Sequence, residues 1–213
     1  MSTKVLVIQF PGSNCEYETR RALRYYGLCA DIVRWNEDPS VVTRADAYVL
    51  PGGFSYQDRV RAGAICAKLP ILQHLQEAND LKKPILGICN GCQILAEAGL
   101  IEVTPKKGLQ VALAPNLDQE KPIGFICDWV YVSFRNPQKN VFTKCYTTSD
   151  VLPVAINHGE GRFVFDADVR ACVQDVAQVI YTDQTGAMTQ QANPNGSEMN
   201  VAGVSNRAGN VLA

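Results

Sequence analysis

The chain has 213 residues and a formal net charge of −1, from 20 Lys and Arg against 21 Asp and Glu. Nucleic acids and anionic membranes both bind proteins with a surplus of basic residues, so this balance predicts neither as a partner and favours a metabolite-sized ligand. Hydrophobic residues make up 46% of the chain and charged residues 19%, which indicates one folded domain and excludes a disordered chain.

The first 100 residues alternate short apolar runs with helix-like segments, as in a parallel sheet covered by helices. Strands are predicted at residues 4–9, 31–35, 47–50 and 84–88. Helices are predicted at residues 17–26, 58–78 and 89–98, the second of which Pro70 can interrupt. This order predicts a doubly wound α/β fold.

After Gly108 the pattern changes to strands joined by turns rich in Asn, Pro and Gly. These strands are predicted at residues 124–134, 154–157, 162–165, 177–182 and 201–204. Because no linker separates the two parts, we predict a single mixed domain over residues 1–213, with a parallel core first and an antiparallel layer later.

The N-terminal apolar stretch, residues 5–8, is too short for a signal peptide, and no run reaches the roughly 18 apolar residues of a membrane-spanning helix. We therefore expect a cytoplasmic protein in which the eight cysteines stay reduced. A zinc site needs about four clustered ligands. Only Cys89 and Cys92 lie at ligand spacing, so no metal site is predicted.

Three polar segments follow predicted strands: FPGSNC at residues 10–15, PGGFSYQD at 51–58 and GICNGCQ at 87–93. In open parallel sheets, ligands bind beyond the carboxyl ends of the strands. These three segments therefore mark the predicted functional site.

The third segment matches the G-x-nucleophile-x-G elbow, in which two glycines allow a tight turn from strand to helix. Gly87 and Gly91 would be these glycines and Cys89 the nucleophile. A cysteine at a helix N-terminus is expected to have a lowered pKa, and the N–H group of Asn90 could help to hold an oxyanion. The glycine pair Gly52 and Gly53 would let further N–H groups face the same cavity.

Two other interpretations of this segment stay open. Cys89 and Cys92 also form C-x-x-C, which opens a helix in thioredoxin-like redox proteins. Cys89 could alternatively be a structural cysteine beside a glycine turn.

Six segments together resemble the small glutaminase subunits of phosphoribosylformylglycinamidine synthase, which are class I glutamine amidotransferases. They are FPGSNC (10–15), PGGFSYQDRVRAG (51–63), GICNGCQIL (87–95), FICDWVYV (125–132), HGEGRF (158–163) and NPNGSEMNVAGVSNRAGNV (193–211). They occur in the family's order and span nearly the whole chain. The resemblance implies a flavodoxin-like, three-layer α/β fold with a mixed, mostly parallel sheet.

The resemblance also implies a mechanism. Cys89 would attack the side-chain amide of glutamine, and N–H groups at Gly53, Phe54 and Asn90 would hold the oxyanion. Gln93, one helical turn past the nucleophile, would help to position the glutamine. Water would then hydrolyse the glutamyl thioester.

The family resemblance implies two protein partners. The ammonia would pass to a large synthetase subunit that makes formylglycinamidine ribonucleotide in purine biosynthesis, and a small accessory subunit is expected as well. ATP and magnesium are expected on the synthetase subunit. No cofactor is expected in this chain, which has no G-x-x-x-x-G-K-S or G-x-x-x-x-G-K-T sequence.

The sequence departs from the family at its end. A cysteine amidase needs a base, normally a histidine oriented by a carboxylate. The family supplies both in a Pro-His-Pro-Glu segment just after Gly-Asn-Val, but this sequence ends Gly209-Asn210-Val211-Leu212-Ala213. We therefore expect a chain truncated at its C-terminus, with little or no glutaminase activity in the form printed.

Two histidines are present, but neither is expected to replace the missing base. His74 lies within a predicted helix, and His158 belongs to a motif that coexists with the usual catalytic histidine, so pocket shaping or subunit contact is expected of it. A milder departure is Gln57, where the family usually has glycine. It suggests that this turn need not adopt a positive φ.

Two alternative functions stay open beside the glutaminase. One is a non-catalytic module that binds the synthetase without making ammonia. The other is a stand-alone cysteine hydrolase or redox protein that uses Cys89 and Cys92.

Overall fold

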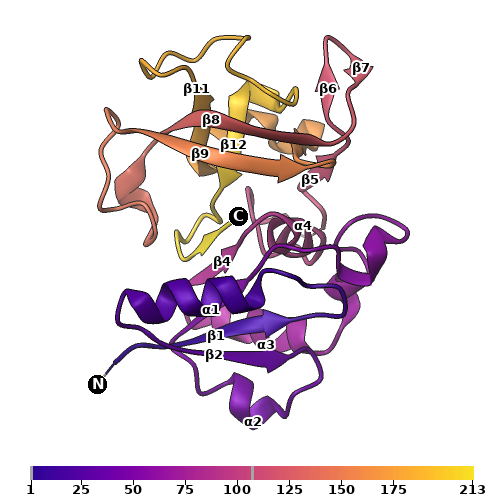
Figure 1. Cartoon of the computed structure of the whole chain (residues 1–213), viewed down its shortest axis with the longest axis vertical. Coiled ribbons are helices and arrows are strands. Elements are labelled where there is room, and N and C mark those ends of the chain that lie inside the picture. Colours follow the sequence, from indigo (N-terminus) through magenta and orange to yellow (C-terminus); the bar gives the residue numbers. More distant parts are fainter. Residues whose placement is uncertain (1, 107) are drawn as a thin grey trace. The chain divides into compact units, whose positions relative to one another are not determined.

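The computed structural model of the chain describes residues 2–106 and 108–213 (Figure 1). They form two compact units: the first runs to Leu100 and includes Ala213, and the second spans Ile101–Leu212. The sequence predicts one mixed domain, and the backbone contacts divide it close to Gly108, where the predicted pattern of strands and helices changes.

The first unit contains four parallel strands in the order β2-β1-β3-β4. They are β1 (Lys4–Gln9), β2 (Cys29–Arg34), β3 (Ala47–Leu50) and β4 (Ile85–Gly87). The chain goes to one side of β1 for β2 and to the other side for β3. The order therefore reverses between β1 and β3, which is where open parallel sheets bind ligands.

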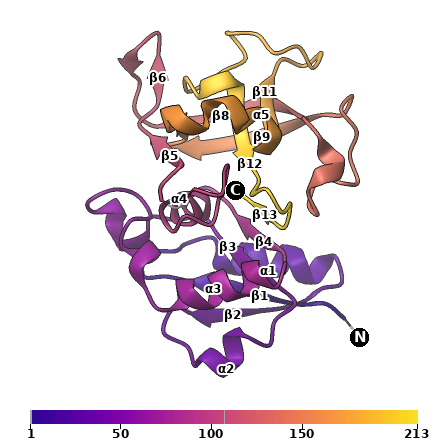
Figure 2. The same cartoon turned by 180° about the vertical axis from the view of Figure 1, so that it is seen from behind.

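Helices cover both faces of this sheet. Helix α1 (Glu16–Tyr25) packs on β1 and β2, and α4 (Asn90–Glu97) packs on β3 and β4. Helix α3 (Ile71–Asp80), which contacts the short α2 (Pro39–Val42), lies on the face opposite α1 (Figures 1 and 2). The three-layer α/β fold is confirmed. Within residues 2–106 and 108–213, no helix has the length and hydropathy to cross a membrane.

Helices cover both faces of the sheet in the first unit, so its strands bury apolar side chains on both faces. Val5, Val7, Ala30 and Val49 form one buried cluster. Leu6 and Ile8, which alternate with Val5 and Val7 along β1, are also almost completely buried. Burial of each such aliphatic side chain contributes about 1.5–3 kcal/mol to folding.

The long helix predicted over residues 58–78 is wrong in its first half. Two short 3-10 turns, Ser55–Asp58 and Cys66–Lys68, occupy this region, and α3 begins only after Pro70. Proline fits at a helix start because it lacks the N–H group that would remain unbonded there.

Left-handed backbone explains why no helix forms after β3. The φ angles of Tyr56, Gln57 and Asp58 are 52°, 59° and 52°, and that of Val60 is 73°. Such residues cannot continue a right-handed helix. The expectation that Gln57 need not adopt a positive φ is therefore wrong: it takes a left-handed conformation, which glycine adopts at no steric cost.

The second unit consists mainly of antiparallel sheets. The largest has the order β9-β8-β11-β12, and β10 pairs with β5 and β6 with β7. The bounds are β5 (Val111–Ala114), β6 (Leu117–Asp118), β7 (Lys121–Pro122), β8 (Ile126–Phe134), β9 (Val151–His158), β10 (Arg162–Phe165), β11 (Ala177–Thr182), β12 (Val201–Val204), β13 (Val211–Leu212) and α5 (Val173–Val176). The antiparallel arrangement predicted after Gly108 is confirmed.

Gln57→Gly is expected to stabilise the first unit by about 0.5–1 kcal/mol. A left-handed conformation costs a non-glycine residue about 1–2 kcal/mol, and glycine loses roughly half of this gain to its greater backbone entropy in the unfolded chain. Urea-induced unfolding measures the change.

The matched control is Gln76→Gly within α3, where the same exchange is expected to destabilise the protein by about 1 kcal/mol. Destabilisation by both substitutions would contradict the strain assigned to position 57.

Candidate active site

The three polar segments of the sequence follow β1, β3 and β4 in the structure. Because β3 lies between β1 and β4 in a parallel sheet, the loops after these strands lie next to one another at one edge. The structure therefore brings the predicted nucleophile and the predicted glycine pair together.

Gly53 joins the loops that follow β1 and β3. Its backbone pairs with Ser13 in an antiparallel bridge. A side chain at position 53 would place its Cβ atom 2.7 Å from the Cα atom of Ser13, and the φ of Gly53 is 150°. Only glycine lets these two backbones meet in this way. The contact fixes the direction of the Gly53 N–H group.

Cys89 occupies the elbow between β4 and α4. Its φ of 53° and ψ of −109° are strained for a non-glycine residue, and the residue is exposed. A Cβ atom on Gly91 would overlap the carbonyl oxygen of Leu50, and one on Gly87 would lie 2.7 Å from the Gly91 carbonyl oxygen. The two glycines thus allow α4 to start close against β3 and β4.

Desolvation by the surrounding protein raises the pKa of the Cys89 thiol. A hydrogen bond from the Asn90 N–H group lowers this pKa, the nearby Cys15 and Asp58 raise it by charge repulsion, and a hydrogen bond from the Gly53 N–H group lowers it. Desolvation is the largest effect, so the thiol is protonated at neutral pH. The expectation that the helix N-terminus lowers the pKa of Cys89 is therefore wrong.

The N–H groups of Gly53 and Asn90 both reach the sulfur of Cys89. Two such donors beside a nucleophile are the usual form of an oxyanion hole. The expectation for Phe54 needs correction, because its N–H group donates to the carbonyl oxygen of Gly12 at 2.9 Å. Phe54 instead helps to hold the loop after β3 against the loop after β1.

The side chain of Asn90 connects the loop after β3 to α4. Its Oδ1 atom accepts a hydrogen bond from the Ser55 N–H group at 3.1 Å. Its Nδ2 group donates to Gln93 Oε1 at 2.9 Å and to Asp58 Oδ1 at 3.3 Å. The sequence predicts a role only for the Asn90 backbone. It does not reveal this buried network, because Ser55 and Asp58 lie far from Asn90 in the sequence.

Gln93 is buried beneath the elbow, with 8% of its surface exposed. Gly63 packs against its backbone: with a φ of 79°, a Cβ atom there would lie 2.7 Å from the carbonyl carbon of Gln93. The structure places Gln93 one turn after the nucleophile, as the sequence predicts. Its contact with glutamine stays a prediction.

Cys92 is buried on α4, and desolvation raises the pKa of its thiol further than that of Cys89. A buried, protonated thiol is a poor partner for thiol exchange at neutral pH. Cys15 is exposed, and its sulfur hydrogen-bonds Asn14 Oδ1 at 3.2 Å.

Neither histidine is among the groups that shift the pKa of Cys89 in the described part of the chain. His74 lies on α3, with Nδ1 3.4 Å from Glu77 Oε2. His158 ends β9 in the second unit, where both ring nitrogens are buried without a hydrogen-bond partner among the residues described. Burial lowers the pKa of His158, which keeps its ring neutral at pH 7.

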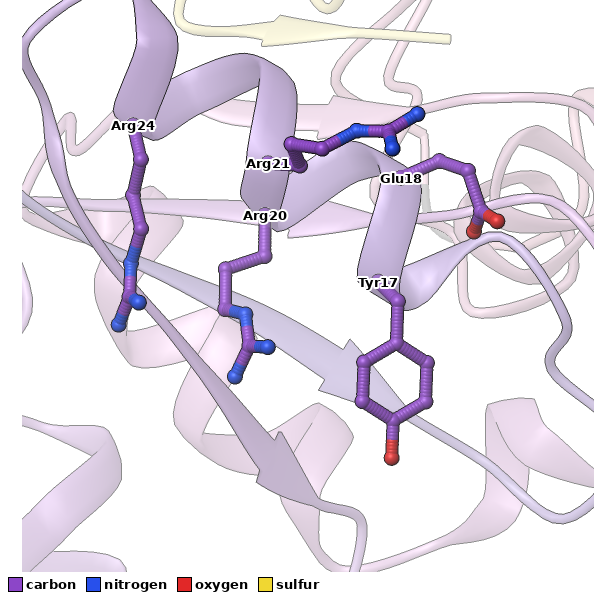
Figure 3. A pocket seen from close by; sticks show the side chains of 5 residues that line it. All are labelled: Tyr17, Glu18, Arg20, Arg21 and Arg24. Carbon is purple, nitrogen blue, oxygen red and sulfur yellow. The ribbon is translucent and has the colours of Figure 1, made fainter.

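A separate hollow of about 350 Å³ lies on α1, lined by Tyr17, Glu18, Arg20, Arg21 and Arg24 (Figure 3). Tyr17, Arg20 and Arg24 extend to the same side of the helix, and the Arg20 guanidinium lies 5.4 Å from the Tyr17 ring centre. Arg24 pairs with Asp31 at 2.7 Å. This hollow contains no nucleophile and is not the candidate active site.

No group of three or more His, Cys, Asp or Glu side chains is arranged to hold a metal ion in the residues that the structure describes. The groups that the structure brings together at the elbow are the thiol of Cys89 and the N–H groups of Gly53 and Asn90.

Comparison with known proteins places this chain in a family. A family model of the CobB/CobQ-like glutamine amidotransferase domain matches residues 2–213. The chain is 42% identical to phosphoribosylformylglycinamidine synthase subunit PurQ of Pyrococcus furiosus, over 98% of this chain and 85% of that protein. The chain belongs to the PurQ family of glutamine amidotransferases.

Another PurQ relative and two solved structures are also similar to this chain. PurQ of Methanocaldococcus jannaschii is 39% identical over 98% of this chain and 85% of its own length. The PurLQS structure of Thermotoga maritima has a chain 32% identical to this one, with a TM-score of 0.79 over 100% of this chain and 85% of that chain. Another glutamine amidotransferase from Thermotoga maritima, 18% identical with a TM-score of 0.54 over 100% of this chain and 74% of that chain, has the same fold.

Alkylation of Cys89 by iodoacetamide is expected to titrate at a higher pH in the folded PurQ-family chain than in the urea-unfolded chain. The thiolate is the form that reacts, and desolvation raises the pKa of the folded thiol. Mass spectrometry of the Cys89 peptide after short exposures across a pH series measures both curves.

Cys89→Ser serves as the control that identifies the modified peptide. A folded-state midpoint at or below the unfolded one would contradict the desolvation assigned to this thiol.

Proposed function

We propose that this chain is the glutaminase subunit of phosphoribosylformylglycinamidine synthase, which takes ammonia from glutamine for de novo purine biosynthesis. The observation that carries the proposal is the exposed Cys89 on a strained elbow, with two N–H groups at its sulfur, in a chain of the PurQ family. Glutamine is the proposed substrate.

The reaction begins when the Cys89 sulfur attacks the side-chain carbonyl carbon of glutamine. The carbonyl oxygen gains negative charge, and the N–H groups of Gly53 and Asn90 donate hydrogen bonds to it. Such preorganised donors are worth about 3–4 kcal/mol each in acyl transfer. The nitrogen of the amide leaves as ammonia once it has received a proton, and a γ-glutamyl thioester remains for water to hydrolyse.

The raised pKa of Cys89 makes a proton acceptor necessary, because the protonated thiol is a poor nucleophile. By family resemblance, a histidine of a Pro-His-Pro-Glu segment after Gly-Asn-Val accepts this proton and returns it to the leaving nitrogen. His74 and His158, the two histidines of the printed sequence, are not assigned this role.

Gln93 is proposed to position the glutamine. The hydrogen bond from Asn90 Nδ2 to Gln93 Oε1 fixes the orientation of the Gln93 amide for that contact. The same Asn90 side chain holds the loop that carries Gly53. It therefore keeps the N–H group of Gly53 and the amide of Gln93 at a fixed position relative to each other.

The protein partner is a synthetase subunit. In support of this, a chain similar to this one is part of the PurLQS structure. We assign ATP and magnesium to that subunit, which would activate the formylglycinamide ribonucleotide amide for attack by ammonia. A small accessory subunit is proposed as a third component. We place the reaction in the cytosol, where the thiol of Cys89 stays reduced.

Cys89→Ser in the full-length protein, assembled with its synthetase subunit, is expected to lower glutamine-dependent product formation at least about 10³-fold, because serine is a far weaker nucleophile. Synthesis from ammonium salts is expected to stay unchanged, since it bypasses the glutaminase site. Both rates are measured on the same preparation.

Cys29→Ser, the same exchange at an exposed cysteine on β2, controls for a general loss of thiol. If the unmodified complex used ammonium salts but not glutamine, the chain would be a non-catalytic interaction subunit and the glutaminase proposal would fail.

A further inference from the structure

A second exposed thiol lies beside the nucleophile. Cys15 is the residue before α1, with a non-helical φ of −112°, and its N–H group points to the Gly52 carbonyl oxygen at 3.4 Å. This contact and the bridge between Ser13 and Gly53 hold the loop after β1 against the loop after β3. These contacts therefore hold Cys15 next to Gly52 and near Cys89.

Gly52 leaves the space between the two cysteines empty. A Cβ atom at this position would lie 3.5 Å from Cys15 Sγ and 3.5 Å from Cys89 Cβ, with Cys15 Cβ at 3.9 Å. The same point thus borders both side chains.

We propose that Cys15 and Cys89 form a reversible disulfide across Gly52 when the protein meets a peroxide. A disulfide needs Cβ atoms about 3.5–4.5 Å apart. Both cysteines lie on loops, and no side chain on Gly52 separates them. A shift of the loop after β1, together with rotation of both side chains, would bring the two sulfur atoms together. That the disulfide switches off ammonia production rests on the function proposed above.

The chemistry balances with one peroxide per disulfide. The Cys89 thiolate attacks one peroxide oxygen, the O–O bond breaks, and the products are a sulfenic acid and hydroxide, which takes up the proton released by the thiol to give water. The Cys15 thiolate then attacks the Cys89 sulfur and expels the sulfenic oxygen as a second water. Two thiols are oxidised and one peroxide is reduced. Two thiols of a reductant such as glutathione reverse the bond.

Cys15 is better placed than Cys92 to be the resolving thiol. Cys92 is buried on α4 with a strongly raised pKa, whereas Cys15 is exposed. The pKa of Cys15 is itself raised, mainly by desolvation and then by Glu18 and Glu16. Since thiolates are the reacting species, disulfide formation is slow at neutral pH and requires sustained peroxide.

The disulfide has two consequences for the nucleophile. It removes the Cys89 sulfur from the reaction with glutamine, and it withholds that sulfur from further oxidation to the sulfinic acid, which thiols do not reverse. The pair thereby converts irreversible loss of the nucleophile into a reversible arrest.

The test treats the full-length protein, assembled with its synthetase subunit, with hydrogen peroxide. Remaining thiols are then blocked with N-ethylmaleimide, and the unreduced digest is analysed by mass spectrometry. A peptide pair that joins Cys15 to Cys89 is expected, together with a loss of glutaminase activity of at least about tenfold that dithiothreitol restores.

Cys15→Ser is expected to keep its activity without peroxide but to lose it permanently with peroxide, with sulfinic acid found at Cys89. Cys29→Ser is the matched control and is expected to behave as the unmodified protein does. Gly52→Ala places a methyl group at ordinary contact distance from both cysteines and is expected to slow formation of the linked peptide pair.

A linkage between Cys89 and Cys92, or full recovery of Cys15→Ser by dithiothreitol, would overturn the inference. If the untreated protein hydrolyses glutamine but peroxide produces no Cys15–Cys89 linkage, the inference fails and the proposed function stands. If the linkage forms in a protein that never hydrolyses glutamine, the disulfide stands and the proposed function fails.

Discussion

Two close approaches of backbone to backbone determine the rest of the site. Gly91 brings the first turn of α4 against the carbonyl oxygen of Leu50, and Gly53 brings the loop after β3 against Ser13. At both places a single Cβ atom would push the segments apart. The sheet edge therefore fixes the nucleophile and its two N–H donors mainly through the main chain. The Asn90 side chain adds a link between the loop after β3 and α4.

This arrangement partly desolvates the exposed thiol as well as orienting it. Desolvation outweighs the two N–H groups, so Cys89 rests in its neutral form and does not carry a charge until a base removes the proton. The same two donors interact more strongly with a full negative charge than with a neutral thiol or a carbonyl group. They consequently favour the charged states that follow attack more than the resting state.

The sequence predicts the parallel strands well, because residues 4–9 and 47–50 are short, mostly apolar runs that contain β-branched or aromatic side chains. It predicts the elbow from two glycines at fixed spacing. It fails after β3, where left-handed Tyr56, Gln57 and Asp58 carry no glycine to reveal the turn. It also fails for the pKa of Cys89, since desolvation depends on packing by segments distant in sequence.

Asn90 has two tasks in one residue. Its backbone N–H group reaches the Cys89 sulfur, and its side chain bonds the Ser55 N–H group and Gln93. Loss of the first turn of α4 would therefore release the loop after β3 in the same event. Amide hydrogens at Asn90 and Ser55 should then exchange with solvent together, as one cooperative opening. A substitution that loosens either segment would disable binding and chemistry jointly.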